Sequence, residues 1–292
     1  MTGAEGAAHF GTRLAAAMQA HGPVCVGIDP HPGLLGQWGL ADDVDGLRRF
    51  ALGVLDALGG RVAAVKPQSA FFERHGARGV AVLEEVLASA RDAGTLSVLD
   101  VKRGDIGSTM AGYADAYLRD GAPLAADAVT LSPYLGFEAL RPALDLARRT
   151  GRGVFVLALT SNPEGAGVQH ARTGAGSVAG QMVDGAAAEN ARVLAEGAGA
   201  GLGPVGLVVG ATTGTAVRAL GLDLAAVRGP LLAPGVGAQG AGAAELAEVF
   251  GDARAQVLAS TSRGVLRAGP DPQALRDALA AGVDAARAAL TS

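Results

Sequence analysis

Short apolar runs of strand length recur along the 292 residues of this chain, and stretches of helix length separate them. The runs are nearly continuous in apolar residues, which is typical of strands buried on both faces of a parallel sheet. We therefore expect eight strands, at residues 24–29, 62–66, 95–102, 128–132, 153–160, 205–210, 230–233 and 256–261.

The connecting stretches have the period of amphipathic helices. Residues 44–58 place apolar side chains three to four positions apart, and residues 80–90, 177–195 and 272–290 repeat this spacing. Alternating strands and helices predict right-handed parallel crossovers, and eight such units match an α/β fold of the (β/α)8 TIM barrel type. We also expect an extra N-terminal helix at about residues 7–18. An open, doubly wound sheet is the alternative, because periodicity alone does not distinguish it from a closed sheet.

No linker or change of composition divides the chain, so we expect one domain over residues 1–292. The longest stretch without a period is 161–176, which is rich in glycine and follows the fifth expected strand. Its place at a strand end suits a mobile lid over a binding site, and a tolerated surface insertion is the other interpretation.

Composition excludes several classes of protein. Hydrophobic residues make up 49% of the chain and charged residues 18%, which is enough apolar surface for a core. The single cysteine, Cys25, rules out an intrachain disulfide and any site built from several cysteines. A net charge of −4 with dispersed arginines gives no footprint for nucleic acid. No apolar run is long enough for a signal core or a membrane span, so we expect a cytoplasmic protein.

Only two of the 24 basic residues are lysines, and both stand at expected strand ends. Lys66 closes the second strand, and Lys102 lies in the segment Asp100-Val101-Lys102-Arg103-Gly104-Asp105 at the end of the third. Residues i and i+2 of a strand share a face, so Asp100 and Lys102 should project together into the barrel mouth. Asp105, just past the strand, should reach the same region. An ordinary salt-bridged strand end is the alternative, but two lysines on neighbouring strands favour an active site with a mobile proton.

Two loops after the last strands resemble a phosphate site. Residues 234–240 contain Gly235 and Gln239 and offer unhindered backbone N–H groups, and Arg263 follows the eighth strand. These are the loops that bind phosphate in many (β/α)8 barrels. The five histidines lack metal-ligand spacing, which favours surface or loop positions. Ser108 and Thr109 are expected to cap the helix that follows the Asp-rich turn.

The motifs together resemble those of the orotidine 5'-phosphate decarboxylase family, in its longer bacterial subgroup. The resemblance extends over nearly the whole barrel, and the D-x-K-x-x-D element with a lysine on the preceding strand is its most specific part. Its motifs are VGIDP (26–30), VKPQ (65–68), LDVKRGDIGST (99–109), LTSNPEG (159–165), APGVGAQG (233–240) and STSRG (260–264).

This resemblance implies a cofactor-free, metal-free homodimer that converts orotidine 5'-monophosphate to UMP and CO₂ in pyrimidine biosynthesis. Lys102 would protonate C6 of the pyrimidine, Asp100 would lie beside the scissile carboxylate, and Lys66 would connect that pair to the ribose. The partner's site would be completed by Asp105 and Thr109. The implied substrate contacts are Asp29 to the ribose, Ser161 to the pyrimidine, and Gly235, Gln239 and Arg263 to the phosphate.

Other functions remain open from the residues alone. A related Mg²⁺-dependent sugar-phosphate decarboxylase or aldolase would use the same D-x-K-x-x-D element. A Schiff-base aldolase would use a buried lysine as nucleophile. A barrel that binds a nucleotide without turning it over belongs to a different class altogether.

Overall fold

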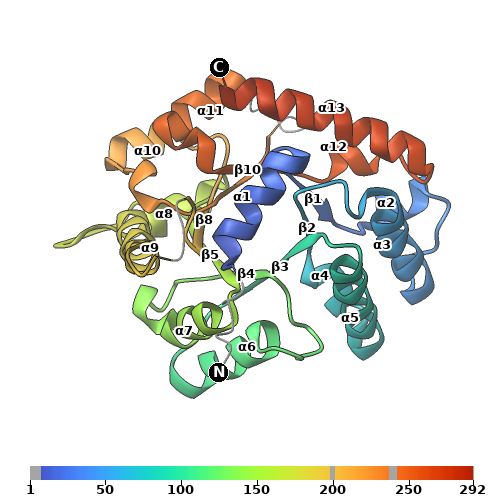
Figure 1. The fold of residues 1–292 in the computed structure, drawn as a ribbon, viewed down its shortest axis with the longest axis horizontal. Helices are drawn as coiled ribbons and strands as arrows, with labels where there is room; N and C mark the ends of the chain where they lie inside the picture. Colours follow the sequence, from blue (N-terminus) through green and yellow to red (C-terminus); the bar gives the residue numbers. More distant parts are fainter. Residues whose placement is uncertain (1–7, 198–200, 237–241, 292) are drawn as a thin grey trace.

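A computed structural model describes residues 8–197, 201–236 and 242–291 of the chain. Within these residues eight parallel strands close into a barrel, in the order β1-β10-β9-β8-β5-β4-β3-β2 (Figure 1). Strand β1 pairs with both β2 and β10, so the sheet has no free edge and the TIM barrel prediction is confirmed. The barrel strands are β1 (Val24–Ile28), β2 (Ala64–Pro67), β3 (Leu96–Arg103), β4 (Ala128–Leu131), β5 (Gly153–Leu159), β8 (Val205–Val209), β9 (Leu231–Pro234) and β10 (Val257–Thr261).

Helices surround the barrel on its outside (Figure 1). None of the helices in the described part of the chain is long and apolar enough to cross a membrane. The α-helices are α1 (Phe10–His21), α2 (Pro32–Gln37), α3 (Val44–Leu58), α4 (Ser69–Glu73), α5 (Gly76–Asp92), α6 (Gly107–Leu118), α7 (Arg141–Thr150), α8 (Ala166–Gln169), α9 (Val178–Ala195), α10 (Gly214–Leu220), α11 (Ala243–Phe250), α12 (Arg263–Leu266) and α13 (Pro272–Thr291). Short 3-10 helices are η1 (Phe137–Leu140), η2 (Pro163–Gly165), η3 (Ala225–Val227) and η4 (Gly251–Gln256).

The strands separate two hydrophobic clusters. Val98 and Cys25 belong to the cluster inside the barrel, and Cys25 is a free, buried thiol as expected. Leu99 and Val101 belong to the larger cluster between the strands and the helices. Because alternate residues of β3 face opposite sides, Asp100 continues the inward-facing row that begins at Val98. This alternation directs Asp100 into the barrel mouth.

Helix α1 closes the barrel at the amino ends of the strands. Phe10 is fully buried and meets the ring of Phe155 edge to face, with the ring centroids 5.9 Å apart. A Cβ at Gly153, the first residue of β5, would lie 2.2 Å from the Phe10 ring, so only glycine fits there. The helix ends three residues later than predicted, at His21. With this end closed, a ligand must enter at the carboxyl ends of the strands.

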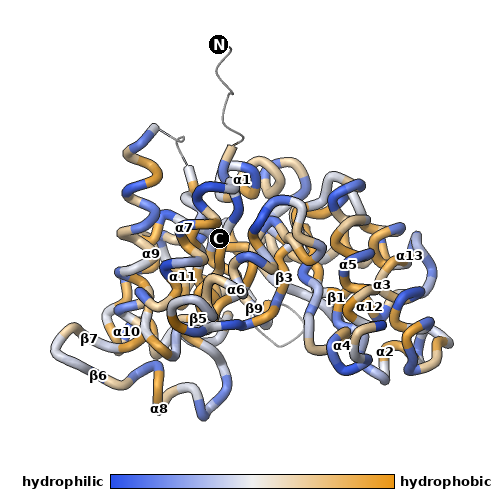
Figure 2. Tube along the Cα trace, turned by 90° about the horizontal axis from the view of Figure 1, so that it is seen from below, coloured by the Kyte–Doolittle hydropathy of each residue, from blue (hydrophilic) through white to orange (hydrophobic). Residues whose placement is uncertain are grey.

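Residues 161–177 lie on the opposite side of the molecule from α1 (Figure 2). The segment consists of short elements joined by turns: η2, α8 and the antiparallel pair β6 (Arg172–Thr173) and β7 (Gly176–Ser177). The side chain of Gln169 ties this segment back to the end of β5. Its Oε1 accepts from the Thr160 N–H at 2.9 Å, and its Nε2 donates to the Thr160 hydroxyl at 2.7 Å. Short-range hydrogen bonds of this kind leave no periodic hydrophobic signal in the sequence.

Candidate active site

A cavity of about 490 Å³ opens at the carboxyl ends of the barrel strands. Charged and polar side chains line it together with apolar side chains of β5, β8 and β9. The lining residues are Asp29, His31, Lys66, Gln68, Asp100, Lys102, Thr130, Leu157, Leu159, Thr160, Ser161, Val208, Gly210, Leu232, Pro234, Gly235, Val236, Ser260, Thr261, Ser262 and Arg263.

Lys66, Asp100 and Lys102 form one hydrogen-bonded cluster in this cavity. The ammonium of Lys66 donates to Oδ2 of Asp100 at 3.0 Å, and that of Lys102 donates to Oδ1 at 2.5 Å. The side chains of Lys66 and Asp100 are each 7% exposed, whereas that of Lys102 is 45% exposed and faces the open cavity. The cluster therefore presents one accessible ammonium, supported from behind by a buried ion pair.

The buried pair keeps both partners charged. Burial by itself raises the pKa of Asp100, but the ammonium groups of Lys66 and Lys102 outweigh it and lower the pKa to about 2. Burial likewise opposes the charge on Lys66, yet Asp100 and Asp29 outweigh it and raise its pKa. At neutral pH the cluster thus holds a carboxylate whose oxygens already bind two cations.

A bulge in the β3–β4 ladder brings Lys102 to Asp100. Leu99 pairs with Val129 and Arg103 pairs with Leu131, so residues 100–102 oppose the single residue Thr130. Lys102 takes a φ of +46°, a left-handed conformation that is uncommon for residues other than glycine. The two side chains do lie together, as we predicted. The reason is the bulge at residues 100–102 and not regular strand alternation. Such strained bulges occur next to active sites, where they redirect a side chain.

Asp29 follows β1 and is held by the loop after β10. The hydroxyl of Ser262 donates to its Oδ2 at 2.5 Å, while its Oδ1 is buried without a hydrogen-bond partner among the described residues. A Cβ at Gly27 would lie 2.0 Å from the Ser262 Oγ, so glycine is required for this contact. A buried acceptor that lacks a donor at the edge of a cavity is suited to a ligand hydroxyl.

The predicted phosphate-binding residues lie across the mouth from the lysine cluster. Gly235 and Arg263 line the cavity after β9 and β10. In the ring of eight strands β9 is opposite β3, so a ligand whose phosphate lay here would extend across the barrel toward Lys102. Gln239 lies outside the described residues.

Ser161 lines the cavity beside Thr160, at the end of β5. Sequence reasoning missed several polar residues that also line the cavity, among them Gln68, Thr130 and His31. Gln68 and Thr130 had a detectable signal, because each is two residues beyond an inward-facing position of its strand. His31, which we assigned to the surface or a loop, is exposed and also meets the Phe71 ring edge to face, with centroids 4.2 Å apart.

Asp105 and Thr109 are not among the described residues that line the cavity of their own chain. The carboxylate of Asp105 instead accepts from the N–H of Ile106 at 2.8 Å, and Thr109 is exposed. The expected capping role of Ser108 and Thr109 was wrong, because α6 already begins at Gly107. Neither Asp105 nor Thr109 therefore contributes to the cavity of its own chain.

The described residues include no cluster of three or more histidine, cysteine, aspartate or glutamate side chains placed to hold a metal ion. The charges available in the cavity are those of the lysine cluster, Asp29 and Arg263. This arrangement offers a proton donor at one end, a hydroxyl acceptor between, and an anion site at the other end.

The sequence and the fold are both similar to those of known proteins. Residues 22–278 match the model of the orotidine 5'-phosphate decarboxylase / HUMPS family. The chain is 61% identical to the orotidine 5'-phosphate decarboxylase of Salinispora arenicola, over 97% of this chain and 98% of that one. It is 58% identical to the enzyme of the same name from Streptomyces coelicolor, over 92% of this chain and 94% of that one.

Among solved structures, a crystal structure from Streptomyces avermitilis, assigned there as an orotidine 5'-phosphate decarboxylase, superposes with a TM-score of 0.91 at 57% identity. The match covers 97% of this chain and 96% of that chain. The OMP decarboxylase of Leishmania donovani superposes with a TM-score of 0.74 at 30% identity, over 97% and 100% of the two chains.

Proposed function

This chain belongs to the orotidine 5'-phosphate decarboxylase family and decarboxylates orotidine 5'-monophosphate to UMP and CO₂ in pyrimidine biosynthesis, and we propose that the Lys66–Asp100–Lys102 cluster performs this reaction. The observation that supports the assignment is the accessible ammonium of Lys102, held 2.5 Å from a buried carboxylate at the mouth of the barrel.

The reaction breaks the bond between C6 of the pyrimidine and its carboxylate. CO₂ leaves without the bonding electrons, which remain on C6 in an orbital that the ring delocalises poorly. Lys102 stabilises this developing charge because its ammonium is already in place and needs no reorganisation. It then donates a proton to C6, which gives UMP and leaves a neutral amine that regains its proton from water.

Lysine is suited to this role and arginine is not. An ammonium is a compact acid whose proton can be transferred, whereas a guanidinium holds its proton at any pH the enzyme meets. Asp100 orients the ammonium, and Lys66 keeps Asp100 ionised in its buried position. This division of roles explains why the lysines occupy these two positions in a chain that otherwise uses arginine.

The rest of the cavity orients the nucleotide. Arg263 and the backbone of Gly235 would hold the phosphate, and the unpaired Oδ1 of Asp29 would accept a ribose hydroxyl. Ser161 would contact the pyrimidine edge. Binding at the phosphate, remote from C6, supplies energy for alignment at the reacting carbon. The segment 161–177, anchored at Thr160, would act as the lid over this cavity.

We propose that the active enzyme is a homodimer in which Asp105 and Thr109 complete the partner's site. Three large apolar side chains are exposed next to these residues: Ile106 at 63%, Tyr134 at 78% and Leu135 at 53%. The loops that bear them touch, because a Cβ at Gly104 would lie 2.1 Å from the backbone oxygen of Ser132. Exposed apolar patches of this kind mark protein–protein contacts.

The test of the proposed chemistry compares Lys102→Ala with Lys102→Arg in the absorbance assay for orotidine 5'-monophosphate. Both variants should lose at least about 10³-fold in kcat, because the proton donor is lost in each. UMP affinity, measured by calorimetry, should change by less than about tenfold, since the phosphate and ribose contacts remain. If the arginine variant retains wild-type turnover, charge alone suffices and the assignment of Lys102 as proton donor fails.

A chelator tests the expectation that the reaction needs no metal: turnover should be unchanged after exhaustive treatment, and a loss of turnover would contradict it. We also propose a cytoplasmic location, because the one cysteine is buried and unpaired, as suits a reducing compartment. Cell fractionation checks this, and recovery of the enzyme outside the cytoplasmic fraction would contradict it.

A further inference from the structure

Thr130 on β4 contacts both Asp100 and Lys102 near the end of β3. Its side chain is buried, with the residue 1% exposed, yet it borders the cavity. Its hydroxyl donates to Oδ1 of Asp100 at 2.8 Å and accepts from the backbone N–H of Lys102 at 3.0 Å. A hydroxyl has one proton to give and lone pairs to receive, so the two bonds are compatible.

The hydrogen bond from the backbone N–H of Lys102 to Thr130 lies at the strained residue of the bulge. Lys102 has a φ of +46°, and residues 100–102 oppose Thr130 alone across the ladder. A backbone N–H inside a barrel wall needs a partner, and at this bulge the Thr130 hydroxyl is that partner. The hydroxyl therefore holds Lys102 in the conformation that turns its side chain toward Asp100.

The hydrogen bond from the Thr130 hydroxyl to Asp100 orients the carboxylate. Oδ1 of Asp100 accepts from Lys102 and Thr130, and Oδ2 accepts from Lys66. Of these three donors only Thr130 is uncharged and on a short, stiff side chain, because the branched Cβ restricts its rotation. The lysines supply charge, whereas Thr130 fixes the direction in which the carboxylate points.

We propose that Thr130 is a positioning residue for the decarboxylation. Its hydroxyl holds both the backbone of Lys102 and the carboxylate of Asp100 in place. The inference rests on the proposed role of Lys102. Loss of the hydroxyl would displace the ammonium from the reacting carbon without removing any group that binds the nucleotide. Displacements of about 1 Å can reduce a catalysed rate by about 100-fold.

The experiment compares Thr130→Val, which keeps the shape and removes the hydroxyl, with Thr130→Ser, which keeps the hydroxyl. Thr130→Val should lower kcat by about 10- to 100-fold, while KM and the dissociation constant of UMP stay within about threefold. Thr130→Ser should restore kcat to within about threefold of the wild type. Thr95→Val is the matched control. Thr95 lies just before the start of β3, is also buried, and its hydroxyl accepts from the N–H of Gly60 at 2.7 Å.

The outcomes separate positioning from structure. Wild-type kcat in Thr130→Val, an equal loss in the serine variant, or a rise in KM alone would each overturn the proposal. A loss of kcat in Thr95→Val as large as in Thr130→Val would also overturn it, because any buried hydroxyl would then have the same effect. If Thr130→Val folds poorly, kcat is normalised to the sites that bind UMP, and Thr130→Ala is measured in the same way. An active Lys102→Ala enzyme would contradict the proposed role of Lys102, whereas an inactive one with fully active Thr130→Val would contradict only this inference.

Discussion

Lys66 and Asp100 form a buried ion pair on neighbouring strands, with the ammonium nitrogen 3.0 Å from Oδ2 of the carboxylate and each side chain 7% exposed. Strands β2 and β3 are hydrogen-bonded neighbours in the barrel, and an isolated bridge between Gln68 and Asp100 extends their pairing to this level. Removing charges from water is costly, and the contacts of Lys102 and Thr130 with Asp100 help to offset that cost.

The stability of the enzyme should depend on pH through Asp100. Its pKa is lowered in the fold to about 2 from an ordinary 3.8. A lowered pKa contributes stability at pH above the unfolded value, and the contribution is lost as pH falls from about 4 to about 2. Lys66, whose pKa is raised from 10.5, loses its contribution only at more alkaline pH. Denaturant unfolding between pH 2 and 6 should show a loss of about 2 kcal/mol from Asp100 over this window.

In Lys66→Met the loss of stability at acid pH should occur at higher pH, because one cation fewer then lowers the pKa of Asp100. We expect the free energy of unfolding to fall by about 1–3 kcal/mol at neutral pH. This is less than the cost of leaving a buried charge with no partner, because Lys102 still pairs with Asp100. Arg119→Gln is the matched control, because it removes a cation from an exposed pair with Asp115 and should cost less than about 0.5 kcal/mol. Identical pH profiles for the wild type and Lys66→Met would contradict the coupling.

Mixing two inactive variants should restore activity if the site is shared between subunits. In a heterodimer of Asp105→Ala and Lys102→Ala chains, one site has both mutations and the other has neither. Random exchange at equal concentrations makes half the dimers heterodimers, so about one quarter of the wild-type sites should return. Activity is followed by absorbance after exchange is verified by mass spectrometry. Full exchange without recovery would mean that Asp105 acts in its own subunit.

Gly27→Ala should weaken nucleotide binding. The added Cβ would lie 2.0 Å from the Ser262 Oγ and 3.0 Å from Oδ2 of Asp29, so the pair that positions Asp29 must separate. We expect KM to rise by about tenfold or more and stability to fall by about 1–3 kcal/mol. Gly33→Ala is the control, because nothing lies within 4 Å of a Cβ there. An unchanged KM in Gly27→Ala would argue against Asp29 as a ribose ligand.

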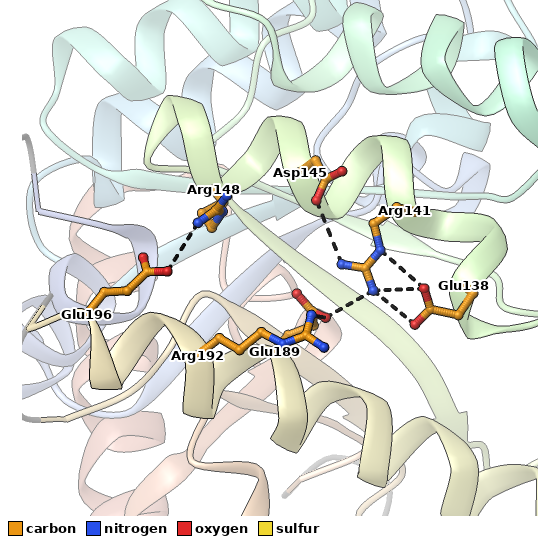
Figure 3. A network of polar contacts seen from close by, with 7 residues as sticks. All are labelled: Glu138, Arg141, Asp145, Arg148, Glu189, Arg192 and Glu196. Carbon is orange, nitrogen blue, oxygen red and sulfur yellow. Dashed lines mark hydrogen bonds and ion pairs between the residues drawn. The ribbon is translucent and has the colours of Figure 1, made fainter.

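A network of ion pairs joins α7 to α9 on the outside of the barrel, with Arg141 at its centre (Figure 3). Arg141 contacts Glu138 at 2.9 Å and the half-buried Glu189 at 3.0 Å. Arg141→Gln should lower the free energy of unfolding by about 1–2 kcal/mol without changing kcat. Arg148→Gln, which breaks an exposed 3.4 Å pair with Glu196, should cost less than about 0.5 kcal/mol. Urea unfolding of both variants checks this, and equal losses would contradict a special role for Arg141.

Much of this protein follows from local patterns. Strand and helix periods, the glycines of the loops and the two lysines at strand ends are properties of short segments, and they predicted the barrel and the Lys66–Asp100–Lys102 cluster. The residues whose roles the resemblance implied lie at the cavity where they fall within the described chain, apart from Asp105 and Thr109. These patterns are informative because the spacing of apolar residues along a segment shows which of its faces is buried.

Only the tertiary structure decided how distant segments meet. Closure of the sheet depends on β1 pairing with β10, more than 200 residues away in sequence, and no local period records that pairing. The bulge that turns Lys102 toward Asp100 is a mismatch of register between β3 and β4, and it makes Thr130 their common partner. A bulge is defined by how two paired strands align, so the sequence of one strand does not contain it. The two lysines were visible in the sequence, but the hydroxyl and the bulge that position them became visible only when the strands were paired.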